Sequence, residues 1–169
     1  MDKRRVAALL KRVPWTGYLA QSIWRIWQPW VTVGVVGAVF NDAGKLLVVE
    51  HVFHPKSPWG LPGGWMNRGE DPDETIRREI REETALRVEV IKPLIVARTP
   101  YLSRHLDMAY LCYAPPDAGD IILSGELLAH RWIERSEFAS LQPESLPMPH
   151  FHARVIELAE RERELSCRG

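Results

Sequence analysis

Three glutamates near the middle of the sequence have the spacing of side chains on one helix face. Glu79, Glu82 and Glu83 stand at positions i, i+3 and i+4, which share a face at about 100° per residue. Such carboxylates repel one another by roughly a few tenths of a kcal/mol per pair even in solvent. Two interpretations are open: a solvated face paired with nearby arginines, or a site for a hard cation such as Mg²⁺.

The helix that carries these glutamates has a well-marked start. Asp71 is a favourable N-cap residue, Pro72 suits the first helical position, and Glu74 at N3 completes a capping box of the D-x-x-E kind. The pattern predicts a helix over residues 72–84 with an apolar stripe beside its acidic face. That stripe can pack on a sheet, and the register of the glutamates is then fixed.

Two adjacent glycines, Gly63 and Gly64, precede this helix, and a backbone without Cβ atoms can approach a ligand or present a carbonyl oxygen to a metal. From Gly64 to Leu86 the sequence resembles the Nudix box, GX5EX7REUXEEXGU with U aliphatic, and Trp59-Gly-Leu-Pro-Gly-Gly64 resembles its usual lead-in. Every charged position of the motif is present. Ala85 stands where the family has glycine, and we expect it to alter the helix C-cap rather than the chemistry.

The resemblance to the Nudix family implies an α/β fold, an αβα sandwich with a mixed β-sheet. It also implies hydrolysis of a phosphoanhydride bond in a nucleoside diphosphate linked to another moiety, with Mg²⁺ or Mn²⁺ as the cofactor. The implied metal-site residues are Gly64, Glu79, Glu82 and Glu83. The implied catalytic residues are Arg78, Glu79, Glu82 and Glu126, with Gly63 and Glu70 in supporting positions.

The general base stays open, because members of the family use either a box glutamate or a carboxylate elsewhere. Glu126, six residues before Trp132, stands where several relatives carry a metal-binding or base glutamate. An ordinary loop acid is an equally good interpretation, since loops hold both kinds of residue. Glu50, at the end of a predicted strand, is a weaker candidate.

Few residues of the sequence indicate how a substrate would be recognised. The candidate substrate-binding residues are Trp59, Trp65, Arg98, Tyr101 and Arg104. The aromatic rings could stack on a base, worth about 1–3 kcal/mol, and the arginines could meet phosphates. Core packing and solvated surface are the competing interpretations for each of them.

The resemblance allows several activities. The favoured substrates are a nucleotide sugar such as ADP-ribose or a modified nucleoside triphosphate, and pruning of a triphosphate to a monophosphate is a variant of the same chemistry. A Nudix-like ligand-binding or regulatory domain without hydrolytic activity is the alternative. Such domains often lose box carboxylates, and this sequence retains all of them.

Composition excludes several other classes. The chain has 169 residues, with 22 basic and 22 acidic residues, so we expect no specific nucleic-acid binding. Two distant cysteines, Cys112 and Cys167, exclude a disulfide scaffold and suit a reducing, cytoplasmic compartment. No apolar run reaches the roughly 18 residues of a membrane span.

The first thirty residues differ from the rest. They hold six basic residues against one acidic residue, a net charge of +5, and four of the seven tryptophans. We therefore expect an N-terminal basic, Trp-rich helical arm over residues 1–29, with helices over 2–12 and 17–28 broken at Pro14, and a Nudix domain over 30–169. The arm packs on the body or on a homodimer partner, or it touches a membrane surface; the link into the first strand favours packing.

The remaining segments predict strands and helices that interleave without a regular βαβ repeat. The predicted strands are residues 31–40, 46–52, 87–97, 108–113 and 130–133, and the predicted final helix is 151–165. Residues 59–66 are rich in glycine and predict an irregular segment.

Overall fold

The β-branched segments of the sequence form one mixed sheet. A computed structural model describes residues 14–28, 30–53, 57–98, 102–141 and 150–166, and its described part contains a seven-stranded sheet. The strands are β1 (Thr32–Phe40), β2 (Leu46–His51), β3 (Trp59–Gly60), β4 (Gly63–Trp65), β5 (Glu89–Arg98), β6 (His105–Tyr113) and β7 (Leu127–Ile133). The chain divides into two units, residues 1–31 and residues 32–169, and the sheet belongs to the second.

Strand β1 is the centre of the sheet. It pairs in parallel with β6 along its whole length, whereas the other strand pairs are antiparallel. The strand order is β3-β2-β1-β6-β5, with β4 also on β1 and β7 also on β2. Near its start β1 pairs with β4, so the glycine-rich segment is held in the sheet beside the strand that runs through the middle of the fold.

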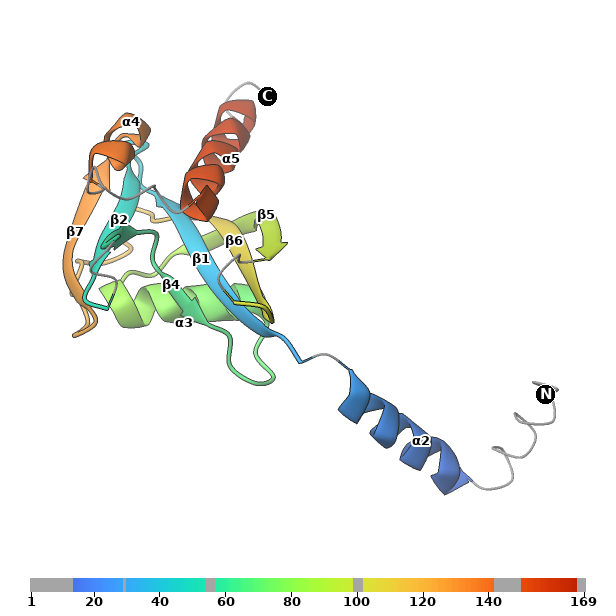
Figure 1. The fold of residues 1–169 in the computed structure, drawn as a ribbon. Coiled ribbons are helices and arrows are strands. Elements are labelled where there is room, and N and C mark those ends of the chain that lie inside the picture. Colours follow the sequence, from blue (N-terminus) through green and yellow to red (C-terminus); the bar gives the residue numbers. More distant parts are fainter. Residues whose placement is uncertain (1–13, 29, 54–56, 99–101, 142–149, 167–169) are drawn as a thin grey trace. The chain divides into compact units, whose positions relative to one another are not determined.

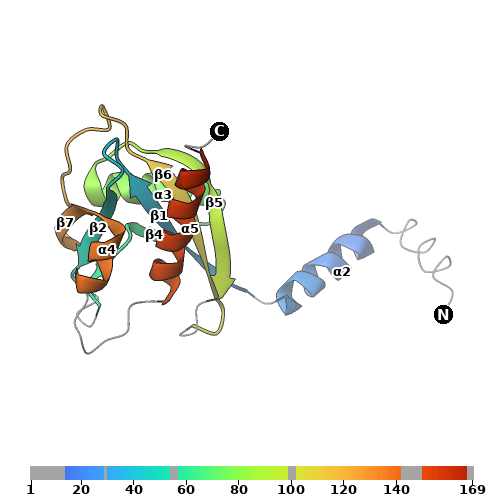
Figure 2. The same cartoon turned by 90° about the horizontal axis from the view of Figure 1, so that it is seen from above.

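Helices cover both faces of the sheet (Figures 1 and 2). Helix α3 (Pro72–Thr84) packs on one face, where its Ile76 and Ile80 join a core with Val35 and Val39 of β1. Helix α5 (His150–Ser166) packs on the other face through apolar side chains of its own. The short helix α4 (Arg135–Phe138) and the 3₁₀ turn η1 (Ala139–Leu141) follow β7. The predicted αβα sandwich with a mixed sheet is confirmed.

Helix α3 packs so closely on β1 that only glycine fits at position 37 of the strand. A Cβ atom at Gly37 would lie 2.9 Å from the Cδ1 atom of Ile80 and 3.3 Å from Ile76. Ile76 and Ile80 are fully buried, and burying such a side chain is worth about 1.5–3 kcal/mol. This packing fixes the rotation of α3, and with it the direction of the acidic face.

Both ends of α3 follow the prediction. Asp71 is the N-cap, Pro72 opens the helix, and Glu74 completes the capping box. Ala85 is the C-cap in the left-handed conformation, with φ of 63°, and its N–H donates to the Arg81 carbonyl over 2.9 Å. It is the one described non-glycine residue with a positive φ. Ala85 thus ends α3 in the left-handed conformation that favours glycine, and its effect on the cap stays a prediction.

Other boundaries differ from the prediction. Residues 59–66 hold two short strands, β3 and β4, because pairing with β2 and β1 overrides the poor strand propensity of glycine. Strand β6 starts earlier than predicted, at His105. Helix α2 (Pro14–Trp27) begins at Pro14, the residue predicted to break a helix, since proline is tolerated in a first turn. The predicted helix over 2–12 lies outside the described residues.

None of the helices in the described ranges combines the length and the apolar character needed to cross a membrane.

We predict that Ala85→Gly stabilises the fold. A left-handed L-residue costs about 1–2 kcal/mol, part of which is offset by the flexibility of glycine in the unfolded chain. The free energy of unfolding should rise by about 0.5–1 kcal/mol, measured in urea. Ala43→Gly, at an exposed turn position without a positive φ, is the matched control and should lose about 0.4–1 kcal/mol. Equal losses in both variants would show that the Ala85 cap is not strained.

Candidate active site

Strand β4 lies against the acidic face of α3 at a distance that only glycine permits. A Cβ atom on Gly64 would lie 2.4 Å from the carboxyl carbon of Glu79. The Gly63 N–H donates to Oε2 of Glu83 over 2.9 Å, and a Cβ on Gly63 would lie 2.1 Å from the Val35 carbonyl oxygen. The backbone of Gly63-Gly64 is therefore placed directly beside two carboxylates of the helix.

Arg78 holds the outer part of this site. Its Nε and Nη2 donate to the two oxygens of Glu70 over 2.7 and 2.9 Å, and its Nη1 donates to Glu79 over 2.8 Å and to Glu82 over 3.1 Å. A further bond runs from Nη2 to the Trp65 carbonyl over 3.1 Å. A guanidinium has five N–H donors, and each of these five bonds uses one. Arg78 thus ties the loop before α3, strand β4 and the acidic face together.

These contacts shift the ionisation of the partners. The Arg78 hydrogen bonds lower the pKa of Glu70 to about 2, and the same pairing raises the pKa of Arg78. Glu70 therefore stays a carboxylate over the whole physiological range. The Asn67 N–H donates to Oε2 of Glu70 over 3.1 Å, and this hydrogen bond closes the loop that leads into α3.

The inner glutamates are shifted in the opposite direction. Burial raises the pKa of Glu79, against the opposing effect of Arg78. Burial raises the pKa of Glu83 to about 8, and the charges of Glu79 and Glu126 add to that shift while the Gly63 N–H opposes it. The carboxylates nearest to the glycine backbone therefore carry negative charge only at an energetic cost in the absence of a cation.

Glu126 reaches this site from a distant part of the chain. It is an exposed residue of the loop before β7, and its charge is felt by Glu83. The Ser124 N–H donates to the Glu83 carbonyl over 2.9 Å, and the Val52 N–H donates to the Glu126 carbonyl over 3.0 Å. The loop is thus anchored to the end of α3 on one side and to the end of β2 on the other.

The donor set suits a hard divalent cation. Glu79 and Glu83 offer carboxylate oxygens beside the Gly63-Gly64 backbone, and a divalent charge there would offset the cost of ionising both. Within the described ranges no three His, Cys, Asp or Glu side chains converge in the manner of a metal cage. Mg²⁺ typically takes one or two carboxylates and keeps several waters, so this smaller set fits Mg²⁺ or Mn²⁺.

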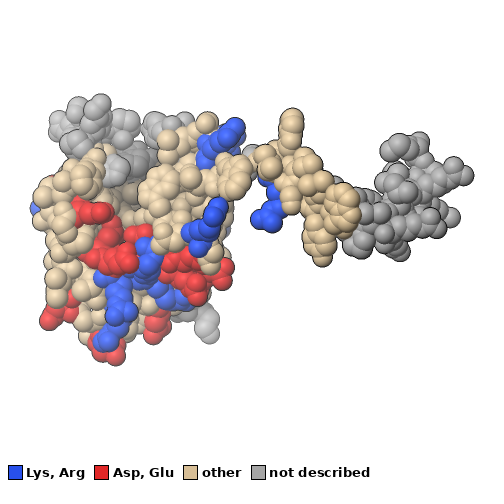
Figure 3. Space-filling model, turned by 90° about the horizontal axis from the view of Figure 1, so that it is seen from below, with Lys and Arg blue, Asp and Glu red and all other residues tan. Residues whose placement is uncertain are grey.

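Glu82 differs from its two neighbours on the helix. Its side chain is 61% exposed and accepts a hydrogen bond from Arg78, whereas Glu83 is 6% exposed. Figure 3, seen from the side of α3, shows the same alternation at larger scale, with acidic and basic side chains interleaved over that face of the body. Glu82 therefore lies on the ion-paired outer face, and Glu79 and Glu83 line the glycine backbone.

Three of the predicted substrate-binding residues lie at one end of the sheet. Trp65 is 56% exposed at the end of β4, and its ring centroid lies 4.6 Å from that of His105. Arg98 ends β5 opposite Leu106 and donates to the Ser103 carbonyl over 3.3 Å. Arg104 is exposed next to His105. The fold thus gathers an exposed indole and two guanidinium groups around the start of β6.

A polar network that the sequence did not reveal supports Trp65. His105 is buried between Thr32, whose Oγ1 lies 2.8 Å from Nδ1, and Asp107, whose Oδ1 lies 3.0 Å from Nε2. A Cβ on Gly34 would lie 2.9 Å from the imidazole, so this ring also depends on a glycine. The contact joins residues 73 positions apart, and no local sequence signal predicts it.

Two candidates are placed differently. Trp59 is 8% exposed and belongs to the core under α5, with the Arg131 guanidinium 5.0 Å from its ring centroid. It is therefore a core residue and not a stacking surface, because its apolar area is already buried by the sheet. Tyr101 lies outside the described residues. Glu50 lies within β2, paired with β3 and β7.

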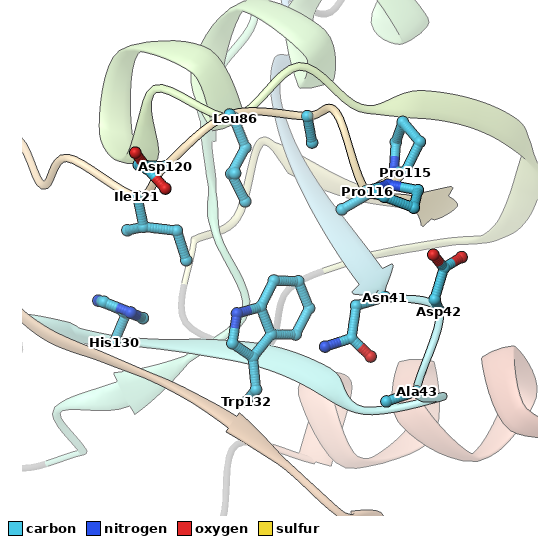
Figure 4. A pocket seen from close by; sticks show the side chains of 13 residues that line it. Asn41, Asp42, Ala43, Leu86, Pro115, Pro116, Asp120, Ile121, His130 and Trp132 are labelled. Atoms are coloured by element: carbon cyan, nitrogen blue, oxygen red, sulfur yellow. The ribbon is translucent and has the colours of Figure 1, made fainter.

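A cavity of about 590 Å³ lies beyond the C-terminal end of α3. Figure 4 shows the Trp132 indole facing it, with Leu86, Ile121 and Pro116 around the opening. Two polar side chains of its lining have partners: Asn41 accepts from the Lys45 N–H over 2.9 Å, and Asp42 accepts from the Tyr113 hydroxyl. None of the α3 carboxylates is among the residues that line this cavity.

We predict that ionised Glu83 destabilises the metal-free fold. Its folded pKa of about 8 lies above the ordinary glutamate value of 4.5, so stability is lost as pH rises from about 4.5 to 8. Glu83→Gln keeps an acceptor for the Gly63 N–H and removes this loss. In EDTA, the variant should gain on the order of a few kcal/mol over wild type between pH 5 and pH 8, by urea unfolding. Glu82→Gln, at an exposed position, is the control. Parallel stability curves for wild type and Glu83→Gln would contradict the buried charge.

Comparison with known proteins identifies the family. A family model described as NUDIX domain matches residues 29–158. The human protein named nucleoside diphosphate-linked moiety X motif 6 is 30% identical over 135 residues, covering 77% of this chain and 42% of that protein. A Nudix hydrolase structure from Nitrosomonas europaea has 21% identity and a TM-score of 0.66, covering 79% of this chain and 73% of that one. An ADP-ribose pyrophosphatase structure from Streptococcus suis has 21% identity and a TM-score of 0.59, covering 82% and 92%.

These likenesses differ in what they show. At such identities the structural matches show the fold. The chain spans about two fifths of the length of the curated relatives it matches. The family model, in contrast, covers more than half of the chain and includes both β4 and α3. On this match, the chain belongs to the Nudix family.

Proposed function

We propose that this protein hydrolyses a phosphoanhydride bond in a nucleoside diphosphate linked to another moiety, with Mg²⁺ or Mn²⁺ as cofactor. The observation that carries the proposal is the placement of the Glu79 and Glu83 carboxylates against the Gly63-Gly64 backbone. Arg78 holds the surrounding acids in a fixed arrangement through its five hydrogen bonds. Fixed hard oxygens beside an open backbone suit a cation that also binds phosphate.

Each residue of the box has a proposed role. Glu79 and Glu83, beside the Gly64 carbonyl, would hold the cation. Glu82 would add negative charge from the outer face, and Arg78 and Glu70 would keep the acids in position. The bound cation would supply positive charge to offset that of the diphosphate and would make an attacking water more acidic. The raised pKa values of Glu79 and Glu83 support this assignment, because a cation would stabilise their ionised forms.

The hydrolytic step needs a base for the attacking water. We assign this role to Glu126, which is exposed and anchored next to Glu83; a box glutamate is the alternative. The water oxygen forms a bond to one phosphorus as the bond from that phosphorus to the bridging oxygen breaks. The base takes one proton of the water, and the bridging oxygen leaves with the second phosphate. The products are two phosphate monoesters.

The substrate class rests on the end of the sheet that holds Trp65. Its exposed indole offers a surface for a base, and Arg98 and Arg104 offer positive charge for phosphates. We propose a nucleotide sugar, such as ADP-ribose, as the preferred substrate and a modified nucleoside triphosphate as the second class. The fold match to an ADP-ribose pyrophosphatase supports the first choice. We also propose that residues 30–169 form the hydrolytic domain and residues 1–29 a separate arm.

A substrate panel tests the proposal. The full-length protein is incubated with ADP-ribose, other nucleotide sugars and modified nucleoside triphosphates, and the products are separated by chromatography. We expect turnover with Mg²⁺ or Mn²⁺ and none in EDTA. Absence of turnover on the whole panel, with nucleotide binding retained, would instead support a ligand-binding domain.

Matched variants locate the activity. Glu79→Gln and Glu83→Gln should each lower kcat by about 10²-fold or more, since each removes a charge at the proposed cation site. Glu74→Gln is the control on the same helix, because glutamine also completes a capping box, and it should keep near-wild-type activity. Wild-type turnover in both site variants would contradict the proposed roles.

A further inference from the structure

Helix α2 exposes several large apolar side chains to solvent. Trp15, Trp24 and Trp27 are 65%, 65% and 83% exposed, and Leu19 and Ile23 are 52% and 51% exposed. Large contiguous apolar surfaces of this kind mark a binding surface for a protein or a membrane. The question is which occupant suits the chemistry of this helix.

All the tryptophan, leucine and isoleucine side chains of α2 lie in one half of the helix. At about 100° per residue, Trp15, Ile26, Leu19, Ile23, Trp27 and Trp24 follow one another around an arc of about 180°. Gln21 and Arg25 lie on the opposite side. The Ser22 hydroxyl, at the border, donates to the Tyr18 carbonyl over 2.8 Å and so adds little polarity. The helix is amphipathic with a wide apolar half.

The composition of this half distinguishes lipid from protein. Three of its six apolar side chains are tryptophans, which prefer the headgroup level of a bilayer, and the other three are leucine and isoleucine. Arg25 is the only charged residue between positions 14 and 31, and residues 1–13 add five basic residues against one acidic residue. On the face seen in Figure 3, the described part of this unit is almost entirely uncharged. Basic charge beside an uncharged apolar half complements an anionic lipid surface.

The end of the helix adds a second feature. A hollow of about 400 Å³ is lined by Arg25, Ile26, Gln28, Trp30 and Val31. One cation, one amide and three apolar side chains match the junction between a lipid phosphate and its acyl chains. The 14 residues of α2 extend about 21 Å at 1.5 Å per residue, which is shorter than the roughly 30 Å hydrocarbon core. The helix can therefore lie in the interface and not cross the bilayer.

We propose that α2 is an in-plane anchor that binds the surface of an anionic lipid bilayer through its tryptophan-rich half, with Arg25 at the headgroup phosphates. The anchor brings the body to the membrane and takes no part in the chemistry of the box.

Vesicle co-sedimentation of the full-length protein tests this proposal. At physiological salt, the protein should pellet with phosphatidylcholine vesicles that contain phosphatidylserine and bind pure phosphatidylcholine more weakly. Trp24→Ser with Trp27→Ser should lower the partition coefficient at least about tenfold, since two buried indoles are lost. Arg25→Gln should weaken binding less and reduce its salt dependence. Vesicles with brominated acyl chains should quench tryptophan fluorescence in wild type and less in the double variant.

Gln21→Ser with Gln28→Ser is the matched control, with the same number of substitutions outside the apolar half, and it should bind like wild type. Thermal unfolding of the body should be the same in both double variants, which separates anchoring from folding. Wild-type protein that stays in the supernatant with anionic vesicles overturns the proposal, as does undiminished binding by the tryptophan variant. A dimer that the tryptophan variant dissociates, without vesicle binding, would make a second copy the occupant and also overturn it.

Discussion

The close approach of α3 to the glycine backbone is the constraint on which the site depends. At Gly37 and Gly64 an added Cβ would meet α3 itself, and at Gly63 it would meet the backbone of β1. These positions let the helix sit low enough for Ile76 and Ile80 to be fully buried. The same approach brings the Gly63 N–H within 2.9 Å of Glu83. Packing and site geometry thus have one cause, since the apolar stripe sets the depth of the helix and the glycines permit it.

Electrostatics divides the acidic face into two parts. On the outer part, Arg78 neutralises Glu70 and Glu82 with hydrogen bonds, and the pKa of Glu70 falls to about 2. On the inner part, burial raises the pKa of Glu83 to about 8. A fold does not gain stability by burying such an acid in the absence of a counter-charge. The burial of Glu83 therefore supports the proposal of a positively charged ligand at this site.

The sequence predicts the parts of this arrangement that depend on local signals. The capping box at Asp71 and the apolar stripe define α3, and the left-handed Ala85 ends it at the expected residue. Local signals do not say which glutamate is buried. Glu82 and Glu83 are neighbours on one face of α3, and they differ in burial because β4 packs against Glu83 and leaves Glu82 exposed. They also leave the burial of Trp59 undecided and miss the pairing of Thr32 with His105, since both follow from contacts between distant strands.

Calorimetric titration of Mn²⁺ into the metal-free protein tests the central claim, that Glu79 and Glu83 form the cation site. The titration is run at pH 7 in two buffers of different ionisation enthalpy, which gives the number of protons released per ion bound. With a Glu83 pKa of about 8, wild type should release a large fraction of a proton on binding. Glu83→Gln should bind more weakly and lose that release. Binding of equal strength in wild type, Glu79→Gln and Glu83→Gln, with no proton released in any of them, would contradict the account.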